Sequence, residues 1–432
     1  MASTEPSSKI LYTLLFLASS GASIGYSAVW SEAAILAERL PEGRYVSICL
    51  FILFNISNGL ALLYCLISLK TKSASACQLI TCLGLSSISS TVLGFFWNQT
   101  LKIRETQISL TAWCCILIIF TTASLHSVAA PLFCWRLRAS NSITAVLAGE
   151  WFGLVIGHVM IIGQKIEKCG QKQKEIVKLN STLLKDSRTD TLRFNVNLYM
   201  FLTAALTVVG GIAIILATNL KCLSKYYEDN RRESVLILDD DSIRHTTPRK
   251  QKKPRETPKL LLLLIISFWS KFVNDGPLSS VLSPASCPYL FFSTKTLIVG
   301  TIGSPSACFL AMLLLRLLPP RSKMASFISL PCLGTILLAY FVALAAFSSR
   351  SAVDSALFTG SGQILTSVAW ATVACLLEYG RGGVFLFCRK LSMKYLIFVV
   401  LASLLGRIMG SYSFLEDFTV CRLYNTNKKA LC

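Results

Sequence analysis

Long stretches of the chain carry no charged side chain. A membrane-spanning helix needs about 20 mostly apolar residues, and several stretches of at least that length lack Asp, Glu, Lys and Arg. These stretches are 10–31, 45–69, 73–101, 106–135, 194–220, 296–315, 324–349 and 355–377. Three more apolar stretches, 139–164, 260–294 and 395–415, hold only one or two charges in their interior. The pattern predicts an all-α, multi-span membrane protein with about eleven transmembrane helices.

The spans fall into two sets separated by a polar segment. Residues 1–220 are expected to form a six-helix bundle with an outer loop at 165–193, and residues 260–432 a five-helix bundle. The segment 221–259 mixes acidic and basic runs, so we interpret it as a solvated cytoplasmic linker. The alternative is a patch for anionic lipid or regulation. Residues 378–394 could add a short amphipathic helix.

Composition supports the membrane assignment. Hydrophobic residues make up 53% of the chain and charged residues 15%, and the mean hydropathy is +0.59. These values exclude a disordered chain and a disulfide-stapled secreted scaffold, and they disfavour a large soluble enzyme. The net charge of +20 is attributed to basic loops that flank membrane helices, not to nucleic-acid binding.

Charge and glycosylation signals predict the orientation. With the N-terminus in the cytoplasm, short basic loops fall inside, and two Asn-x-Thr sequons, at Asn98 and Asn180, fall outside. Both asparagines are therefore candidate glycosylation sites, and the C-terminus is expected to be extracellular. The first span is longer than a signal-peptide core and has no clean cleavage site, so it is expected to be retained.

Ionisable residues within the spans mark the candidate site, because burying a charge in a membrane is costly. Glu150 is near the centre of its span, whereas Glu32 could be an interfacial carboxylate. Lys271 and Asp275 are four residues apart and share a helix face, so they could simply neutralise each other. Arg407 could hold an anion or satisfy backbone carbonyls. His158 lies two turns after Glu150 and could carry protons, although a lone histidine in a span more often serves packing.

Aromatic residues and helix breakers add candidates for ligand contact. Trp30 and Trp151 could stack on a flat ligand. Asn274-Asp275-Gly276-Pro277 and Ser304-Pro305 interrupt their spans, and such breaks are tolerated where backbone lines a cavity.

Cysteine usage points to structure and not to metal binding. The chain has 16 cysteines, and most fall in spans or on the inner side, where they act as small apolar residues. Candidates for exterior disulfides are Cys169, Cys287, Cys421 and Cys432. The spacing of Cys and His predicts no metal site, and the sequence contains no nucleotide-binding or hydrolase motif. An enzyme is therefore not expected.

Blocks of residues through most of the chain follow a family pattern. They are Trp30-Ser-Glu32 with Leu40-Pro41-Glu42-Gly43, Asn55-Ile56, Phe95-Phe96-Trp97-Asn98, Gly149-Glu150-Trp151-Phe152-Gly153-Leu154, Ser286-Cys287-Pro288-Tyr289, Ser304-Pro305-Ser306-Ala307-Cys308 and Ser403-Leu404-Leu405-Gly406. In this order they resemble motifs of the eukaryotic riboflavin transporters, solute carrier family 52. The chain departs from the motifs at Ala33, where the family has proline, and at Trp151, where it has glycine, so it resembles a divergent member.

The resemblance implies a fold related to the nucleoside facilitators and the major facilitators, with helix bundles around a central cavity. It also implies carrier-type transport of riboflavin across the plasma membrane, facilitative or proton-influenced. The expected partners are the substrate riboflavin and the lipid bilayer, with no cofactor and no nucleic acid. The residues expected to bind substrate are Trp30, Glu32, Asn55, Glu150, Trp151 and Ser304, and those expected to form a charge pair or couple transport are Lys271, Asp275, His158 and Arg407. A carrier for another heterocycle, such as a nucleoside, and a receptor that does not transport remain alternatives.

Overall fold

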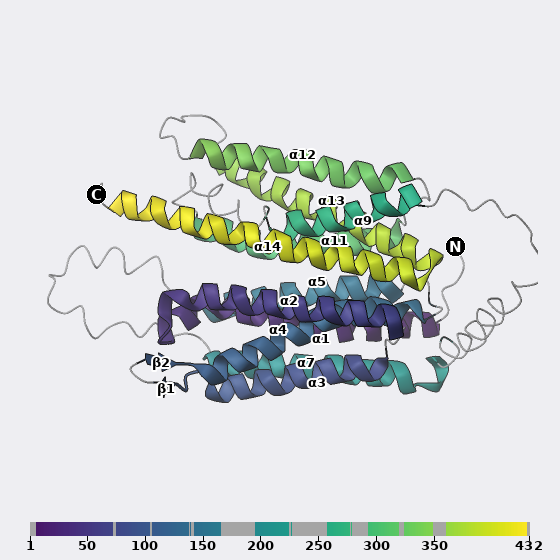
Figure 1. Cartoon of the computed structure of the whole chain (residues 1–432), viewed down its shortest axis with the longest axis horizontal. Helices are drawn as coiled ribbons and strands as arrows, with labels where there is room; N and C mark the ends of the chain where they lie inside the picture. The colour runs from purple at the N-terminus through teal and green to yellow at the C-terminus, as the bar shows by residue number, and fades with distance from the viewer. Residues whose placement is uncertain are drawn as a thin grey trace, which may run out of the picture.

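The computed structural model describes residues 6–71, 75–103, 106–137, 139, 142–165, 195–223, 226, 257–276, 278, 293–318, 324–348 and 360–429. These residues are almost entirely helical (Figure 1). The first helices are α1 (Pro6–Arg39), α2 (Val46–Thr71), α3 (Ala76–Phe96), α4 (Leu110–Trp135), α5 (Ser142–Lys165) and α7 (Val196–Asn219). The later helices are α9 (Thr257–Asp275), α11 (Ser293–Leu317), α12 (Met324–Ser348), α13 (Gly360–Leu391) and α14 (Met393–Lys429).

The remaining elements are short and lie between the helices. Two single-turn 3₁₀ helices are η1 (Gly43–Tyr45) and η2 (Lys221–Leu223). The strands β1 (Leu101–Ile103) and β2 (Thr106–Ile108) pair antiparallel between α3 and α4, with Leu101 opposite Ile108.

Each predicted span overlaps one of these helices, which confirms the all-α, multi-span fold class. Among the described residues, eight helices are long and apolar enough to cross a membrane: α1, α2, α3, α4, α5, α7, α13 and α14. Large apolar side chains on α2, α3 and α7 face outward, with Leu63 55%, Ile88 62% and Ile212 51% exposed. Such surfaces suit contact with lipid and not with water.

The sequence interpretation was wrong about 378–394 and about Pro305. Residues 378–391 are the last turns of α13, which runs without a break from Gly360 to Leu391, and the next helix starts at Met393. The helix α11 likewise continues through Pro305. Neighbouring helices can satisfy the backbone group that a proline frees, so the helix need not end there. The helix α9, in contrast, ends at Asp275, within the predicted break.

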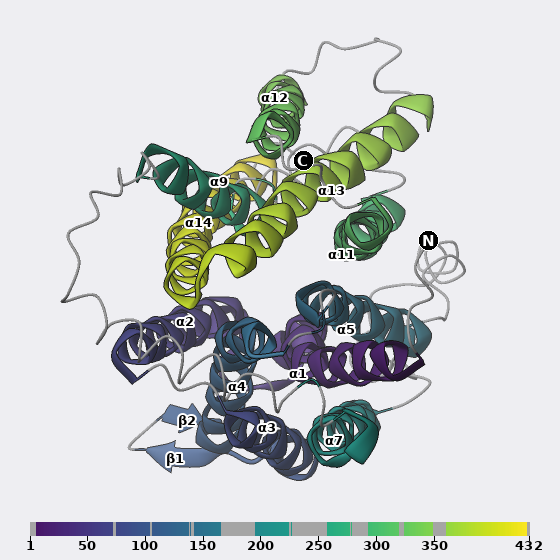
Figure 2. The same cartoon turned by 90° about the vertical axis from the view of Figure 1, so that its right-hand side faces the viewer.

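The helices gather into two groups (Figure 2). In one group α1 packs mainly against α5 and α7, and α3 and α4 lie beside them. In the other, α9 packs against α14, and α13 packs against α11 and α12. The groups meet where α5 contacts α11 and where α2 contacts α14. Most of the predicted linker at 221–259 and nearly all of the predicted outer loop at 165–193 lie outside the described residues.

The closest helix pair in each group is packed through glycines. Gly149 and Gly153 of α5 face the backbone carbonyls of Phe16 and Ser20 in α1, and a Cβ at either glycine would overlap those oxygens. Small residues allow this close approach of helices in membranes.

In the second group, Gly406 and Gly410 of α14 face the backbone carbonyls of Phe268 and Phe272 in α9. Glu150 directly follows Gly149, and Arg407 directly follows Gly406. In each of these two helix pairs, a charged residue therefore directly follows a glycine of the helix contact.

A carboxylate outside the spans ties the turn after α1 to the start of α4. Glu42 accepts hydrogen bonds from the Ser109 backbone N–H (2.7 Å), the Ser109 hydroxyl (3.1 Å) and the Trp113 indole N–H (2.8 Å). The next residue, Gly43, has a φ of 52°, a left-handed conformation that favours glycine. Burial raises the pKa of Glu42, but these hydrogen bonds outweigh burial and hold the pKa below its ordinary value.

We expect Glu42→Gln to destabilise the protein by about 1 kcal/mol at neutral pH, the typical net worth of a hydrogen bond. Because the pKa of Glu42 is lower in the folded state, its stabilisation is present above the unfolded pKa of about 4.3 and is lost as the pH falls further. Thermal unfolding between pH 7 and pH 3 should therefore show a smaller loss of stability in E42Q than in the parent. Glu38→Gln, at an exposed position in the last turn of α1, is the control, and an equal slope in all three proteins would contradict the prediction.

Candidate functional site

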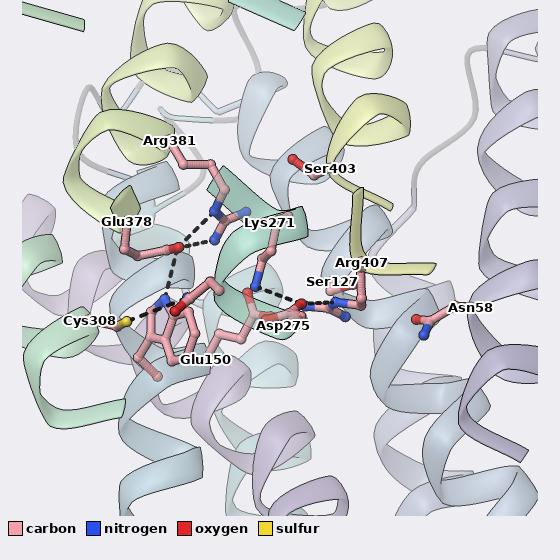
Figure 3. A network of polar contacts seen from close by, with 12 residues as sticks. Asn58, Ser127, Glu150, Lys271, Asp275, Cys308, Glu378, Arg381, Ser403 and Arg407 are labelled. Atoms are coloured by element: carbon pink, nitrogen blue, oxygen red, sulfur yellow. Dashed lines mark hydrogen bonds and ion pairs between the residues drawn. The ribbon is translucent and has the colours of Figure 1, made fainter. Parts of the chain in front are cut away.

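Six charged side chains gather where the two helix groups meet (Figure 3). Glu150 comes from the first group, on α5. The other five come from the second group: Lys271 and Asp275 on α9, Glu378 and Arg381 on α13, and Arg407 on α14. Four of the six, Glu150, Lys271, Asp275 and Arg407, are ionisable residues that the sequence pattern singled out, and the fold brings them together.

Arg407 joins carboxylates from both groups. Its Nη2 lies 3.4 Å from Glu150 Oε1, and its Nε donates to Asp275 Oδ2 at 3.0 Å. Lys271 Nζ lies 3.6 Å from the same Asp275 oxygen. Asp275 therefore has two cationic neighbours, whereas Glu150 pairs with Arg407 as its one cation within the described part of the chain.

A second ion pair lies deeper in the second group. The Arg381 guanidinium donates to Glu378 Oε1 through Nε at 2.8 Å and through Nη2. Trp151 of α5 donates its indole N–H to the same oxygen at 2.9 Å. The Lys271 ammonium lies 4.8 Å from the centre of the Trp151 ring, within the range of a cation–π contact.

The six charges balance, three acidic against three basic. Glu378, Arg381 and Lys271 are at most 3% exposed, and a buried charge is tolerated only when it is paired and hydrogen-bonded. The pairs that cross between α5 and the second group depend on the groups being close. A change in their separation would therefore rearrange the pairing.

A cavity of about 80 Å³ lies beside this network. Its polar lining comes from Ser23, Ser124, Glu150, Lys271, Asp275 and Arg407, and its aromatic lining from Tyr26, Phe54 and Trp151. A smaller cavity of about 20 Å³ borders Glu150, Lys271, Arg381 and Arg407 on another side. Aromatic walls with a few converging polar groups are typical of a small-molecule site.

The aromatic side of the cavity continues along α1. The ring of Tyr26 lies 5.5 Å from Phe54 and 5.4 Å from Phe120, and Trp30 stacks on Phe120 at 6.0 Å. Trp30, a predicted ligand contact, thus extends this cluster from outside the cavity lining.

Other predicted site residues lie away from the cavity. Glu32 of α1 is fully buried and does not line either cavity described above. Asn55 of α2 accepts a hydrogen bond from the Ser411 hydroxyl of α14 at 2.8 Å, so it links the two groups. His158 places Nδ1 2.7 Å from the Leu154 carbonyl of its own helix. Ser304 is half-buried on α11 and outside the lining.

Sequence reasoning missed Glu378 and Arg381, together with Tyr26 and Phe54. The signal for the charged pair was present, because Glu378 and Arg381 are three residues apart within the mostly apolar stretch 366–388. Opposite charges at that spacing face each other on a helix. The aromatic residues carried no distinguishing signal, since the spans hold many such side chains.

The predicted modification sites are only partly described. Asn98 is exposed just after α3, whereas Asn180 is outside the described residues. All twelve cysteines in the described part with placed side chains are free. Three candidates for exterior disulfides, Cys169, Cys287 and Cys432, are not described, and for Cys421 only the backbone is.

Comparison with solved structures identifies the fold. The fold is similar to that of the human organic anion transporter MFSD10, with a TM-score of 0.53 and 12% identity over 96% of this chain and 99% of that one. It is also similar to the major facilitator superfamily proton:xylose symporter XylE, with a TM-score of 0.55 and 13% identity over 94% of this chain and 87% of that one. The chain has the fold of a major facilitator carrier.

Comparison with protein families makes the assignment more specific. The family description "Solute carrier family 52, riboflavin transporter" matches residues 7–426, so the chain belongs to that family. No curated protein matches the chain. The protein is a carrier-type transporter, as the motifs predicted.

Proposed function

We propose that the protein carries riboflavin across the plasma membrane by alternating access, with the cavity beside Arg407 as the substrate site. The observation that carries the proposal is this cavity between the two helix groups, because it combines aromatic walls with paired polar groups. A flavin has a flat ring system with polar edges and a hydroxylated chain, and it needs both kinds of contact. Transport, and not catalysis, is the activity that the family and the fold support.

The size of the cavity supports a moving carrier. At about 80 Å³ it is smaller than the roughly 300 Å³ at which drug-sized ligand pockets begin. A tricyclic ligand would therefore enter only when the helix groups separate. Separation would also break the ion pair between Arg407 and Glu150. Entry of the substrate would therefore require this ion pair to break.

Roles can be proposed for individual residues. Trp151, Tyr26 and Phe54 would form walls for the ring, and Glu150 and Arg407 would meet its polar edge. Trp30 and Asn55 would act in other conformations of the carrier, Trp30 through the aromatic cluster and Asn55 through the contact between α2 and α14. Glu32, Ser304, His158 and Asp275 remain candidates for substrate contact or coupling.

The substrate is tested by uptake of labelled riboflavin into cells that express the protein. We expect saturable uptake that flavin analogues inhibit and nucleosides do not. Strong inhibition by nucleosides would favour the alternative substrate class, and the absence of saturable uptake of either would favour a receptor. Measurement at two pH values, with and without sodium, tests ion coupling.

Proton coupling has a separate test at Glu150. If its carboxylate carries the coupled proton, Glu150→Gln should remove the dependence of uptake on pH, because the amide does not titrate. A pH profile unchanged from that of the parent would exclude Glu150 as the coupling group.

The proposed orientation has a cytoplasmic N-terminus and an extracellular C-terminus. We expect glycosidase treatment to increase gel mobility, and Asn98→Gln and Asn180→Gln each to remove part of the shift. Asn55→Gln, at a sequon within α2, should leave the glycan shift unchanged. An epitope tag in 165–193 that is reached only from the cytoplasm would overturn the orientation.

A further inference from the structure

One aromatic wall of the cavity, Trp151 of the first helix group, is hydrogen-bonded to a residue of the second helix group. Trp151 belongs to α5 and lines the cavity, while its indole N–H is bonded at 2.9 Å to Glu378 of α13. The indole is 6% exposed and Glu378 is fully buried, so water has little access to this bond. A tryptophan N–H that is buried normally needs such a partner.

The acceptor oxygen is itself held by a neighbouring cation. Arg381, one helical turn after Glu378, donates two hydrogen bonds to the same carboxylate oxygen. The Arg381 guanidinium in turn lies 5.2 Å from the centre of the Phe385 ring. A charge-assisted hydrogen bond to a carboxylate fixed in this way is stronger than one between neutral groups.

The face of the Trp151 ring is also in contact with the second helix group. Lys271 lies over the Trp151 ring and pairs with Asp275. Two residues of the second group thus contact the indole, Glu378 at its N–H edge and Lys271 over its ring face. Rotation about the second side-chain torsion of an aromatic residue is otherwise only weakly restricted.

We propose that Glu378 is a positioning residue of the substrate site, which orients the Trp151 indole across the interface so that its ring can stack on the substrate. The role of Trp151 as a substrate contact rests on the proposed function. The orientation of the indole by Glu378 is independent of the proposed function. Because the two residues belong to different helix groups, Trp151 is held in this orientation only while α5 and α13 are close. Affinity for substrate therefore depends on the conformation of the carrier.

The kinetic test compares variants that break the same hydrogen bond from either side. Trp151→Phe keeps an aromatic ring and removes the N–H. The double variant E378M/R381M removes the acceptor together with its cation, so no buried charge is left unpaired. We expect each to raise the KM for riboflavin about tenfold, or ~1.4 kcal/mol, with a much smaller change in maximal rate per transporter at the cell surface.

The triple variant shows whether the pair acts through the indole. W151F/E378M/R381M should have nearly the KM of W151F, because the pair has no N–H left to orient. Additive effects would mean that Glu378 and Arg381 act on the substrate independently, and would overturn the proposal. Trp269→Phe is the matched control, since it removes the 2.8 Å bond to Thr335 from an exposed indole outside the cavity and should leave the KM unchanged.

A second readout needs no substrate. In protein labelled with 5-fluorotryptophan, the ¹⁹F resonance missing from W151F identifies Trp151. We expect this resonance to shift and broaden in E378M/R381M while the Trp269 resonance stays in place. An unmoved Trp151 resonance would overturn the proposal even if riboflavin uptake is confirmed. Absence of uptake by the parent protein together with a shifted resonance would instead reject riboflavin as substrate and leave the positioning role supported.

Discussion

Arg407→Gln is expected to reduce transport by at least 100-fold. The guanidinium is the only group among the described residues that contacts both Glu150 of the first helix group and Asp275 of the second. Without it, Asp275 keeps Lys271, but Glu150 loses its ion-pair partner. The unpaired Glu150, whose side chain is 16% exposed, should lower the stability and the surface expression of the variant, and loss of the proposed contact between Arg407 and substrate should lower uptake per transporter. Uptake of labelled riboflavin, normalised to transporter at the cell surface, measures the effect.

Loss of folding and loss of function can be separated by restoring the charge balance. The double variant R407Q/E150Q removes both the cation and the anion, so no unpaired charge remains at this position. Its surface expression should therefore be higher than that of R407Q. Uptake should stay low, because the proposed substrate contacts are gone. Arg39→Gln, at an exposed position in the last turn of α1, is the matched control and should transport normally. Normal uptake by R407Q at normal surface expression would show that the network has no part in transport.

Gly149→Ala and Gly406→Ala are expected to remove most folded transporter from the cell surface. A Cβ at Gly149 would overlap the Phe16 carbonyl, and one at Gly406 would overlap the Phe268 carbonyl. Both obstacles are backbone atoms, so the helices themselves must separate to make room. Overpacking of this kind costs about 1–3 kcal/mol, and more when backbone must move. Separating these helices would also displace Glu150 or Arg407, the adjacent residues.

Two glycines in neighbouring spans serve as matched controls. A Cβ at Gly59 in α2 or Gly84 in α3 would meet no other atom within 4 Å. Alanine is favoured over glycine in a helix by about 1 kcal/mol, so G59A and G84A should be as stable as the parent or more stable. Thermal stability in detergent and surface expression should both be lower for G149A and G406A than for G59A and G84A. Equal behaviour of all four would contradict the packing that the structure describes.

The helices could be predicted from hydropathy because the membrane imposes a strong constraint. An apolar run of sufficient length has few alternatives to a helix when no water is available for the backbone. The same reasoning was wrong at 378–394, where charges were taken to end the span. Glu378 and Arg381 neutralise each other within α13, so the helix continues through them. Hydropathy counts each charge separately and does not register this pairing.

The candidate site was predicted in part, for a related reason. Glu150, Lys271, Asp275 and Arg407 are conspicuous because a lone charge in an apolar stretch is costly. Tyr26 could not be recognised in this way. An aromatic residue in a span costs nothing, so its position in the sequence does not reveal whether it faces lipid, core or cavity.

The sequence by itself determined the class of protein, the approximate positions of the helices, the family and the set of intramembrane charges. Each of these follows from composition and local order along the chain. The tertiary structure alone decided which charges meet, namely Arg407 with Glu150 and Asp275, and which tryptophan lines the cavity. Pairing between spans depends on how helices are rotated and how closely they approach, and the approach here is set by glycines that contact distant backbone carbonyls. That information is not contained in the hydropathy of any single span.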